Sequence, residues 1–349
     1  MRNANIEVLR AVLMFLIVLG HCCYTDTLRS MPIAQLIQTM TVFSVDAFVF
    51  ISGWYSIRLR FAKVFSLCGV ALYAAVVLFL LSPLARGAWR FSYSLGWFGN
   101  SYLGLMLLSP FLNAGVERLR SQGLVPILFA CTVLIIFGWL PLSDLGINLR
   151  PSGCSSHTVC AMAYVYLLAR CLALLRADER VGVGLLVTMA ITSWTLMVGW
   201  VLAGHWFRDN GTVFGWLLRA DGWSYLSPFV VLTASSVFLV FLRISIPCWL
   251  CRICSFLAPS VFGIYLYHSA VNPETSCAFM ERLQQTEIAW MGSGVLSVAF
   301  VAFSSAVVVY FLGVMLDLFR RMSVRWLGLR ELVDKVELHS FWREKEGKR

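Results

Sequence analysis

Residues 64–83 read VFSLCGVALYAAVVLFLLSP, a run of 20 residues without a charged side chain. A transmembrane helix needs about 20 consecutive, mostly apolar residues, so this run is long enough to cross a bilayer. Comparable runs recur at 7–24, 39–57, 97–113, 124–141, 157–176, 182–203, 225–242, 256–272 and 292–316. The sequence therefore predicts an all-α integral membrane protein with about ten transmembrane helices in one bundle.

The composition excludes a soluble globular protein. Of the 349 residues, 59% are hydrophobic and 13% are charged, with a mean hydropathy of +0.78. Soluble domains carry about 25% charged residues. The net charge of +10 comes from basic residues in short loops and in the tail, which is typical of membrane proteins and does not indicate a nucleic-acid partner.

The loop charges favour one orientation. With the N-terminus in the cytosol, the cytosolic loops hold fourteen Lys and Arg residues and the opposite loops hold seven. The cytosolic set is Arg2, Arg58, Arg60, Lys63, Arg118, Arg120, Arg170, Arg176, Arg180, Arg243, Arg252, Arg320, Arg321 and Arg325. The opposite set is Arg29, Arg86, Arg90, Arg150, Arg208, Arg219 and Arg282. By the positive-inside rule, we expect both termini in the cytosol. The last outer loop, which carries Glu274, Glu281 and Glu287, agrees with this because it is acidic.

Two regions are expected along the chain. Residues 1–319 form the transmembrane domain, and residues 320–349 form a basic amphipathic tail on the cytosolic membrane surface. Cys248, Cys251 and Cys254 have a C-x2-C-x2-C spacing, but no fourth Cys or His lies close in sequence. We expect no metal site there, and the role of these cysteines stays open.

The first predicted helix contains three ionisable residues, Glu7, Arg10 and His21. Such residues are costly inside a membrane and are functional candidates by default. Arg10 and His21 are eleven residues apart, which brings them within about 20° on one helix face and about 16 Å apart along its axis. Two other interpretations are a local Glu7–Arg10 ion pair and a His21 that bonds a neighbouring helix.

This geometry suits a long donor such as a CoA thioester, with a phosphorylated head and a thin reactive arm. Arg10 with Arg58, Arg60 and Lys63 would hold the phosphates, although the last three are also ordinary positive-inside charges. The arm would then reach His21, whose imidazole would take the proton of an attacking sugar hydroxyl. No permanently bound cofactor is expected, and acetyl-CoA would be a substrate.

The second predicted helix contains Asp46, Ser52 and Gly53. The depth of Asp46 is comparable with that of His21, so we expect its carboxylate to orient the imidazole or to stabilise the protonated ring. Ser52 and Gly53 have a commoner alternative, which is to let two helices approach closely.

Three segments resemble the acyltransferase-3 family of membrane O-acyltransferases. The first runs from Arg2-Asn3 through Ile6-Glu7-x-Leu9-Arg10 to Gly20-His21 and includes the family's R-x10-H spacing. The second, Asp46 to Gly53, resembles D-x-F-F-x-x-S-G, with Val49 replacing one aromatic residue. The third, Phe262 to His268, resembles F-G-I-Y-L-x-H. The resemblance covers residues 1 to about 320, and residues 101–113 resemble the exopolysaccharide and capsule branch more weakly.

The resemblance implies transfer of an acetyl or similar acyl group from acyl-CoA to a glycan or lipid-linked glycan in a bacterial inner membrane. It implies that His21 is catalytic, and we expect Asp46 and Glu7 to assist it, while Arg10 helps to bind the donor. Ser52, Tyr265 and His268 are candidates for contacts with the acceptor or for support of the site. Tyr265, Tyr267, Trp206, Trp216 and Trp223 are candidates for stacking on sugar rings, or members of an interfacial aromatic belt.

Two other functions are compatible with the sequence. The buried charges would also suit a transporter or glycan flippase, although no internal symmetry supports one. An inactive scaffold in a polysaccharide assembly complex is a third alternative. Asp317 is expected to pair with Arg320 or Arg321 near the inner end of the last helix, or else to neighbour the donor site. The sequence leaves the acceptor and the oligomeric state open.

Overall fold

The computed structural model describes residues 3–138, 155–209 and 224–327. Helices hold most of these residues and no strand occurs among them, which confirms the all-α prediction. Six segments in these ranges are long and apolar enough to cross a membrane: Ala4–Cys22, Pro32–Trp54, Phe61–Arg86, Val183–Gly204, Cys248–Ala270 and Val295–Trp326. Shorter apolar helices cover Val125–Phe137, Val159–Leu174 and Pro228–Arg243. The count of ten spans and the cytosolic termini therefore stay predictions.

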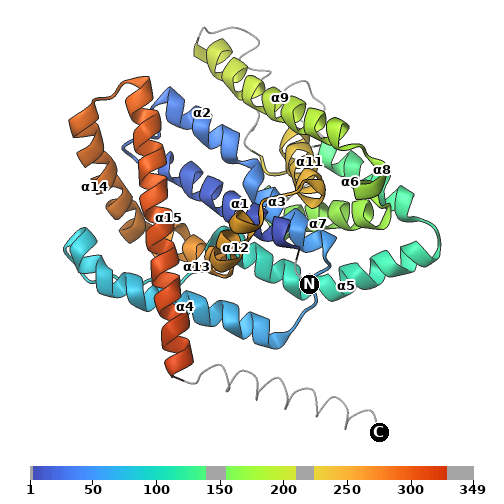
Figure 1. The fold of residues 1–349 in the computed structure, drawn as a ribbon, viewed down its shortest axis with the longest axis horizontal. Coiled ribbons are helices and arrows are strands. Elements are labelled where there is room, and N and C mark those ends of the chain that lie inside the picture. The colour runs from blue at the N-terminus through green and yellow to red at the C-terminus, as the bar shows by residue number, and fades with distance from the viewer. Residues whose placement is uncertain (1–2, 139–154, 210–223, 328–349) are drawn as a thin grey trace.

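The helices follow one another closely along the chain (Figure 1). The first half contains α1 (Ala4–Cys22), α2 (Pro32–Thr41), α3 (Phe43–Trp54), α4 (Phe61–Arg86), α5 (Gly96–Ser121), α6 (Val125–Phe137) and α7 (Val159–Leu174). The second half contains α8 (Ala177–Arg180), α9 (Val183–Asp209), α11 (Pro228–Arg243), α12 (Cys248–Leu257), η2 (Ala258–Ser260), α13 (Val261–Tyr265), η3 (Leu266–Ala270), α14 (Pro273–Met291) and α15 (Val295–Trp326).

Local sequence signals explain several helix ends. The Asn3 side chain accepts a hydrogen bond from the Asn5 backbone N–H at 3.0 Å and caps α1, while Glu7 lies in the first turn, where a negative charge is favourable. Helix α4 ends at Gly87, whose φ of +69° is a conformation that glycine adopts without strain. These signals set where the chain turns between membrane-length helices.

One segment that the sequence assigned to a loop is helical. Residues 273–291, predicted as the last outer loop, form α14. The Asn272 side chain caps it by accepting from the Thr275 backbone N–H, and Pro273 occupies the first turn. The prediction was wrong because it searched for long apolar runs, and α14 mixes polar and apolar residues.

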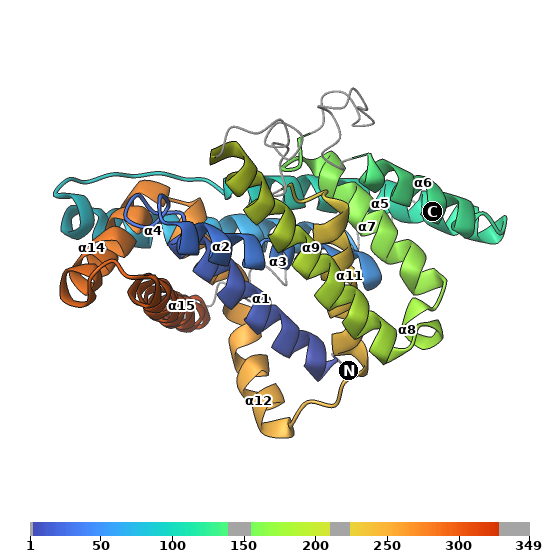
Figure 2. The same ribbon diagram turned by 90° about the horizontal axis from the view of Figure 1, so that it is seen from above.

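Two hydrophobic cores lie on either side of α1. Leu9 and Leu13 belong to one core, with residues of α3, α5, α7, α9 and α11. Met14 and Val18 belong to the other, with residues of α4, α13, α14 and α15. Figures 1 and 2 show α4, α14 and α15 on one side of α1 and α7, α9 and α11 on the other. Helix α1 is thus the shared wall between two packed groups of helices.

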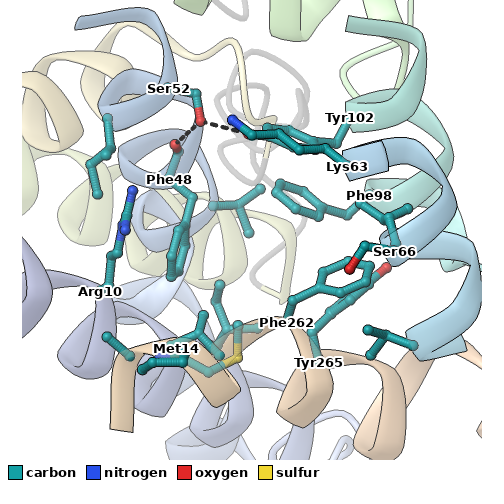
Figure 3. A pocket seen from close by; sticks show the side chains of 18 of the residues that line it. Arg10, Met14, Phe48, Ser52, Lys63, Ser66, Phe98, Tyr102, Phe262 and Tyr265 are labelled. Atoms are coloured by element: carbon teal, nitrogen blue, oxygen red, sulfur yellow. Dashed lines mark hydrogen bonds between the residues drawn. The ribbon is translucent and has the colours of Figure 1, made fainter. Parts of the chain in front are cut away.

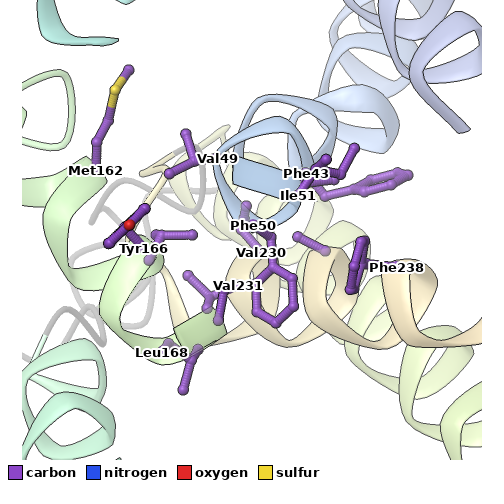
Figure 4. Packing of buried hydrophobic residues seen from close by; sticks show 14 of the residues in the cluster. Phe43, Val49, Phe50, Ile51, Met162, Tyr166, Leu168, Val230, Val231 and Phe238 are labelled. Carbon is purple, nitrogen blue, oxygen red and sulfur yellow. The ribbon is translucent and has the colours of Figure 1, made fainter. Parts of the chain in front are cut away.

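Close packing fixes α3 within the first core. A Cβ atom added at Gly53 would lie 2.6 Å from the Tyr166 carbonyl oxygen and 2.7 Å from Ala169 Cβ on α7, so only glycine allows this approach. On another face of α3, the rings of Phe50 and Phe238 pack with centroids 5.1 Å apart (Figure 4). Gly53 therefore has the small-residue packing role that the sequence offered as an alternative.

The final described helix is longer than predicted. Helix α15 continues to Trp326, past the expected end at 316, so the domain boundary placed between residues 319 and 320 falls inside it. The Asp317 carboxylate pairs with Arg320 three residues on, within the same helix, which helps to keep this part of the chain helical. The remaining tail, 328–349, lies outside the described residues.

Candidate active site

A cavity of about 440 Å³ lies where the two cores meet. Its walls come from α1, α3, α4, α5, α13 and α15, together with the chain just before α11. Arg10 and His21, which the sequence placed on one stripe of α1, both line it. Figure 3 shows Arg10 on one side of the cavity, with Phe98 and Tyr102 across from it. The cavity thus connects the two α1 residues that were predicted to act together.

The end of the cavity nearest Arg10 is strongly basic. Lys63 and Arg320 line this cavity together with Arg10. An adjoining cavity of about 550 Å³ shares Arg10 and Lys63 with it and is also lined by Arg58 and Arg60. All four residues predicted to bind the donor therefore gather around one space, and Arg320 adds a fifth positive charge.

Glu7 supports Arg10 and is remote from His21. Its carboxylate oxygen lies 3.1 Å from Arg10 Nη1, and the Glu7 side chain is 8% exposed. Glu7 lines neither of the two cavities. Because His21 follows it by fourteen residues on the same helix, the two lie about 21 Å apart along the axis. The structure thus brings Glu7 to Arg10, the predicted donor-binding residue, and not to the imidazole it was predicted to assist.

Arg320 is held in place by a buried carboxylate. Asp317 is fully buried, and its two carboxylate oxygens lie 2.7 Å from Arg320 Nε and 3.4 Å from Arg321 Nε. Arg321 in turn donates to the Ser260 hydroxyl at 2.9 Å. Gly263 packs directly on Asp317 and leaves no room for a Cβ atom. The pairing predicted for Asp317 is therefore confirmed, and one of its two arginines, Arg320, lines the cavity.

His21 contacts a second histidine, and that contact was not predicted. His21 Nδ1 lies 2.9 Å from His268 Nε2, and the two rings are 5.0 Å apart. His268 Nδ1 lies 2.7 Å from the carbonyl oxygen of Ile264. His268 is buried and does not line the cavity, whereas His21 does. The pair therefore has an inner member, His268, and a cavity-facing member, His21.

These contacts determine where the hydrogens lie. A carbonyl oxygen only accepts, so the hydrogen of neutral His268 lies on Nδ1, which leaves Nε2 as an acceptor. His21 must then donate to it from Nδ1, and the lone pair of His21 lies on Nε2. An imidazole in this state is ready to accept a proton at Nε2.

A π-helical turn positions His268. Leu266–Ala270 has this wider geometry, and the Val271 backbone N–H donates to the Leu266 carbonyl five residues earlier, at 3.2 Å. Such turns are rare and occur often at functional sites. The π-helical turn at the end of the F-G-I-Y-L-x-H segment thus places His268 against His21.

The other acceptor candidates lie in the cavity wall. The Ser52 hydroxyl bonds both the Phe48 carbonyl and the Tyr102 hydroxyl, each at 3.1 Å (Figure 3). Tyr265 lines the cavity and packs edge-on against Phe98, with centroids 5.6 Å apart. Ser52 is therefore already satisfied within the protein, and Tyr265 shapes the cavity.

Asp46 lies beside a different space. It lines a small cavity of about 10 Å³ and not the cavity of His21. Trp97 and Tyr225, stacked with centroids 4.9 Å apart, line both cavities. In this arrangement His268, and not Asp46, contacts the His21 imidazole.

A family model described as an acyltransferase domain matches residues 3–315. The chain belongs to the acyltransferase-3 family. With its apolar, membrane-length helices, it is a multi-pass membrane acyltransferase that uses an acyl donor and an acceptor. The match does not distinguish the exopolysaccharide branch. No curated protein and no solved structure matches the chain.

Several residues of this candidate site had no signal in the sequence. Trp97, Phe98 and Tyr225 line the cavity, yet they lie in segments that resemble no family motif and have no distinctive spacing. Arg320 also lines it, and the sequence named that residue only as a charge near the inner end of the last helix and a partner for Asp317. These residues meet through the packing of distant helices, which spacing along one element does not reveal.

Other candidates lie away from the acyltransferase site. Tyr267 is buried and does not line the cavity, and Trp206 is 58% exposed. Trp216 and Trp223 lie outside the described residues. Cys248, Cys251 and Cys254 lie on α12, and the residues that the structure describes contain no group of three or more His, Cys, Asp or Glu side chains arranged to hold a metal ion.

Proposed function

We propose that this membrane acyltransferase moves an acetyl group from acetyl-CoA to a hydroxyl of a cell-surface glycan, with His21 as the general base. One observation carries the proposal: a single cavity joins a cluster of basic side chains to the His21 imidazole, whose Nδ1 atom contacts His268. A donor with a polyanionic head and a thin reactive arm fits that layout.

The basic cluster suits the phosphates of CoA. Arg58 and Arg60, in the loop between α3 and α4, and Lys63, in the first turn of α4, are exposed and can meet a nucleotide from the aqueous phase. Arg10 and Arg320 lie deeper and are each fixed by a carboxylate. Guanidinium groups held in one orientation bind phosphate with two hydrogen bonds. From there the pantetheine arm would follow α1 for about 16 Å to His21.

The transfer then needs one proton acceptor. The acceptor hydroxyl oxygen attacks the thioester carbonyl carbon while His21 Nε2 takes the hydroxyl proton. The new C–O bond forms as the C–S bond breaks, and CoA leaves as a thiolate that recovers the proton from His21. During this cycle His268 accepts from His21 Nδ1–H and stabilises the imidazolium.

The membrane orientation follows from charge. The Arg10 end of the cavity belongs with the basic loops, which the positive-inside rule places in the cytosol, where acetyl-CoA is made. His21 then lies towards the opposite face, from which a glycan or lipid-linked glycan would approach. In a bacterium this is the inner membrane.

The test is CoA release from acetyl-CoA by purified protein in detergent, with and without a cell-surface glycan extract. We expect glycan-dependent release together with alkali-labile acetyl groups on the glycan. A folded protein that releases no CoA and acetylates no glycan would contradict the proposal. Uptake of glycan into proteoliposomes without acetylation would instead support transport.

His268 is expected to act as a positioning residue for His21. His268→Phe removes the acceptor of the His21 Nδ1–H bond, and kcat should fall about 10-fold to 100-fold, the value of a hydrogen bond to a charged group. The KM values of both substrates should change less than about 2-fold, since His268 does not line the cavity.

His268→Gln is the matched comparison. Its amide oxygen can accept the same hydrogen bond, so it should recover a large part of kcat. Equal activity of the wild type and the Phe variant would refute the positioning role. A loss that is the same in the Gln and Phe variants, with lower melting temperatures in both, would indicate a purely structural residue.

A further inference from the structure

A buried carboxyl group in the described part of the chain has no use in the chemistry above. Asp46 is 3% exposed, and its Oδ2 atom has no hydrogen-bond partner. A buried polar group without a partner costs free energy, and native proteins keep few of them. A carboxyl group in this condition next to a cavity is a candidate for contact with a ligand.

Aromatic side chains separate the cavity of Asp46 from the cavity of His21. Trp97 and Tyr225 are inclined by 29° and stack 4.9 Å apart. Together with Val45 they line both the small cavity of Asp46 and the main cavity of His21. A ligand group that passes this wall would leave the main cavity and reach the carboxyl group.

The sizes of the two cavities limit what can occupy each. The main cavity, at about 440 Å³, has room for a sugar ring beside the thioester arm. The small cavity, at about 10 Å³, has room for about one water-sized group. One hydroxyl projecting from a ring in the main cavity fits the small one, whereas a second ring does not.

The chemistry of the wall favours a sugar. A carboxyl group accepts hydrogen bonds when ionised and can also donate one when protonated, and a sugar hydroxyl can pair with either form. The carbon-bearing face of a pyranose ring is apolar and packs on aromatic faces such as those of Trp97 and Tyr225.

We propose that Asp46, Trp97 and Tyr225 form the subsite for the sugar ring of the acceptor. The ring packs on the Trp97–Tyr225 wall, one hydroxyl donates to Asp46, and a different hydroxyl faces His21 and is acetylated. This inference rests on the proposed function. It also predicts selectivity, because a site built to receive a hydroxyl rejects a sugar that lacks it.

The test titrates the surface glycan extract, measured by its hexose content, against the wild type and two variants. Asp46→Asn and Trp97→Ala should each raise the half-saturating hexose concentration about 10-fold or more. The half-saturating acetyl-CoA concentration should change less than about 2-fold. Trp97→Phe, which keeps an aromatic ring, should lie close to the wild type.

Two matched controls lie away from the site. Asp26→Asn changes a carboxylate whose side chain is 71% exposed, and Trp290→Ala removes a ring that is 87% exposed. Both should keep wild-type values for the two substrates. Asp46→Asn removes no hydrogen bond from Oδ2, so its melting temperature should hold or rise while its use of glycan falls. A structural role would predict a lower melting temperature.

The outcomes distinguish failure of the proposed function from failure of the sugar subsite. No acetyl transfer by the wild type would overturn the proposed function itself. Normal transfer by the wild type with unchanged glycan dependence in the variants would overturn only the subsite. A raised acetyl-CoA requirement would also overturn it, because Asp46 would then contact an amide N–H of the donor. Should Asp46→Asn not fold, the Trp97→Ala and Trp97→Phe pair decides between these results.

Discussion

His21→Ala is expected to lower acetyl transfer by about 100-fold to 10,000-fold, the usual contribution of a general base. The imidazole is the basic group at the far end of the cavity from the arginines, and its free lone pair at Nε2 follows from the contacts of Nδ1. The loss should fall on kcat, because the proton is transferred only in the reaction. Initial rates of CoA release at saturating substrates measure it.

Chemical rescue provides the control for this variant. The substitution leaves a space beside the main cavity, so free imidazole should restore measurable transfer in His21→Ala and have little effect on the wild type. Gel filtration checks that the variant is folded. If a folded His21→Ala variant keeps its turnover within about 3-fold of the wild type, another group is the base, because general-base catalysis contributes at least about 100-fold.

Arg10→Gln is expected to raise the KM for acetyl-CoA about 10-fold or more, with the KM for the glycan unchanged. Arg10 lines both cavities of the basic cluster, and a guanidinium–phosphate contact has the strength of a charged hydrogen bond. The substitution also leaves Glu7, 8% exposed, without its partner. That loss should cost about 1–3 kcal/mol of stability and lower the melting temperature.

The double variant Glu7→Gln/Arg10→Gln separates binding from folding. It removes the unpaired carboxylate, so the melting temperature should return towards that of the wild type while the KM for acetyl-CoA stays high. If both the melting temperature and the KM for acetyl-CoA returned to wild-type values, Arg10 would serve only the stability of α1. A raised KM for the glycan alone would place the acceptor, and not the donor, at the basic end.

The sequence was sufficient to predict which residues lie together when they belong to one helix or to neighbouring segments. Arg10 and His21 share a stripe because eleven residues make just over three full turns. Arg58, Arg60 and Lys63 lie within six positions of one another, so the loop before α4 and the first turn of α4 present them together. The all-helical fold follows from the length of the apolar runs.

The sequence was insufficient where residues meet across the fold. His268 lies 247 positions from His21 and reaches it from a π-helical turn, which no periodicity predicts. Asp46 was expected at a depth comparable with that of His21, yet it lines a separate small cavity together with Trp97 and Tyr225. Depth in the membrane can be estimated from position along a helix, but the direction of a side chain depends on which neighbours the helix packs against.

The position of α1 between two cores has a consequence for how such enzymes diversify. The residues assigned to the sugar ring come from α3, α5 and the chain before α11, whereas Lys63 and Arg320 come from α4 and α15 on the other side. Under the proposed function, changes in the first group would alter which glycan is accepted while the second continued to bind the same donor. Descendants of one ancestral enzyme would then acquire new acceptors one helix at a time and keep a common acyl donor.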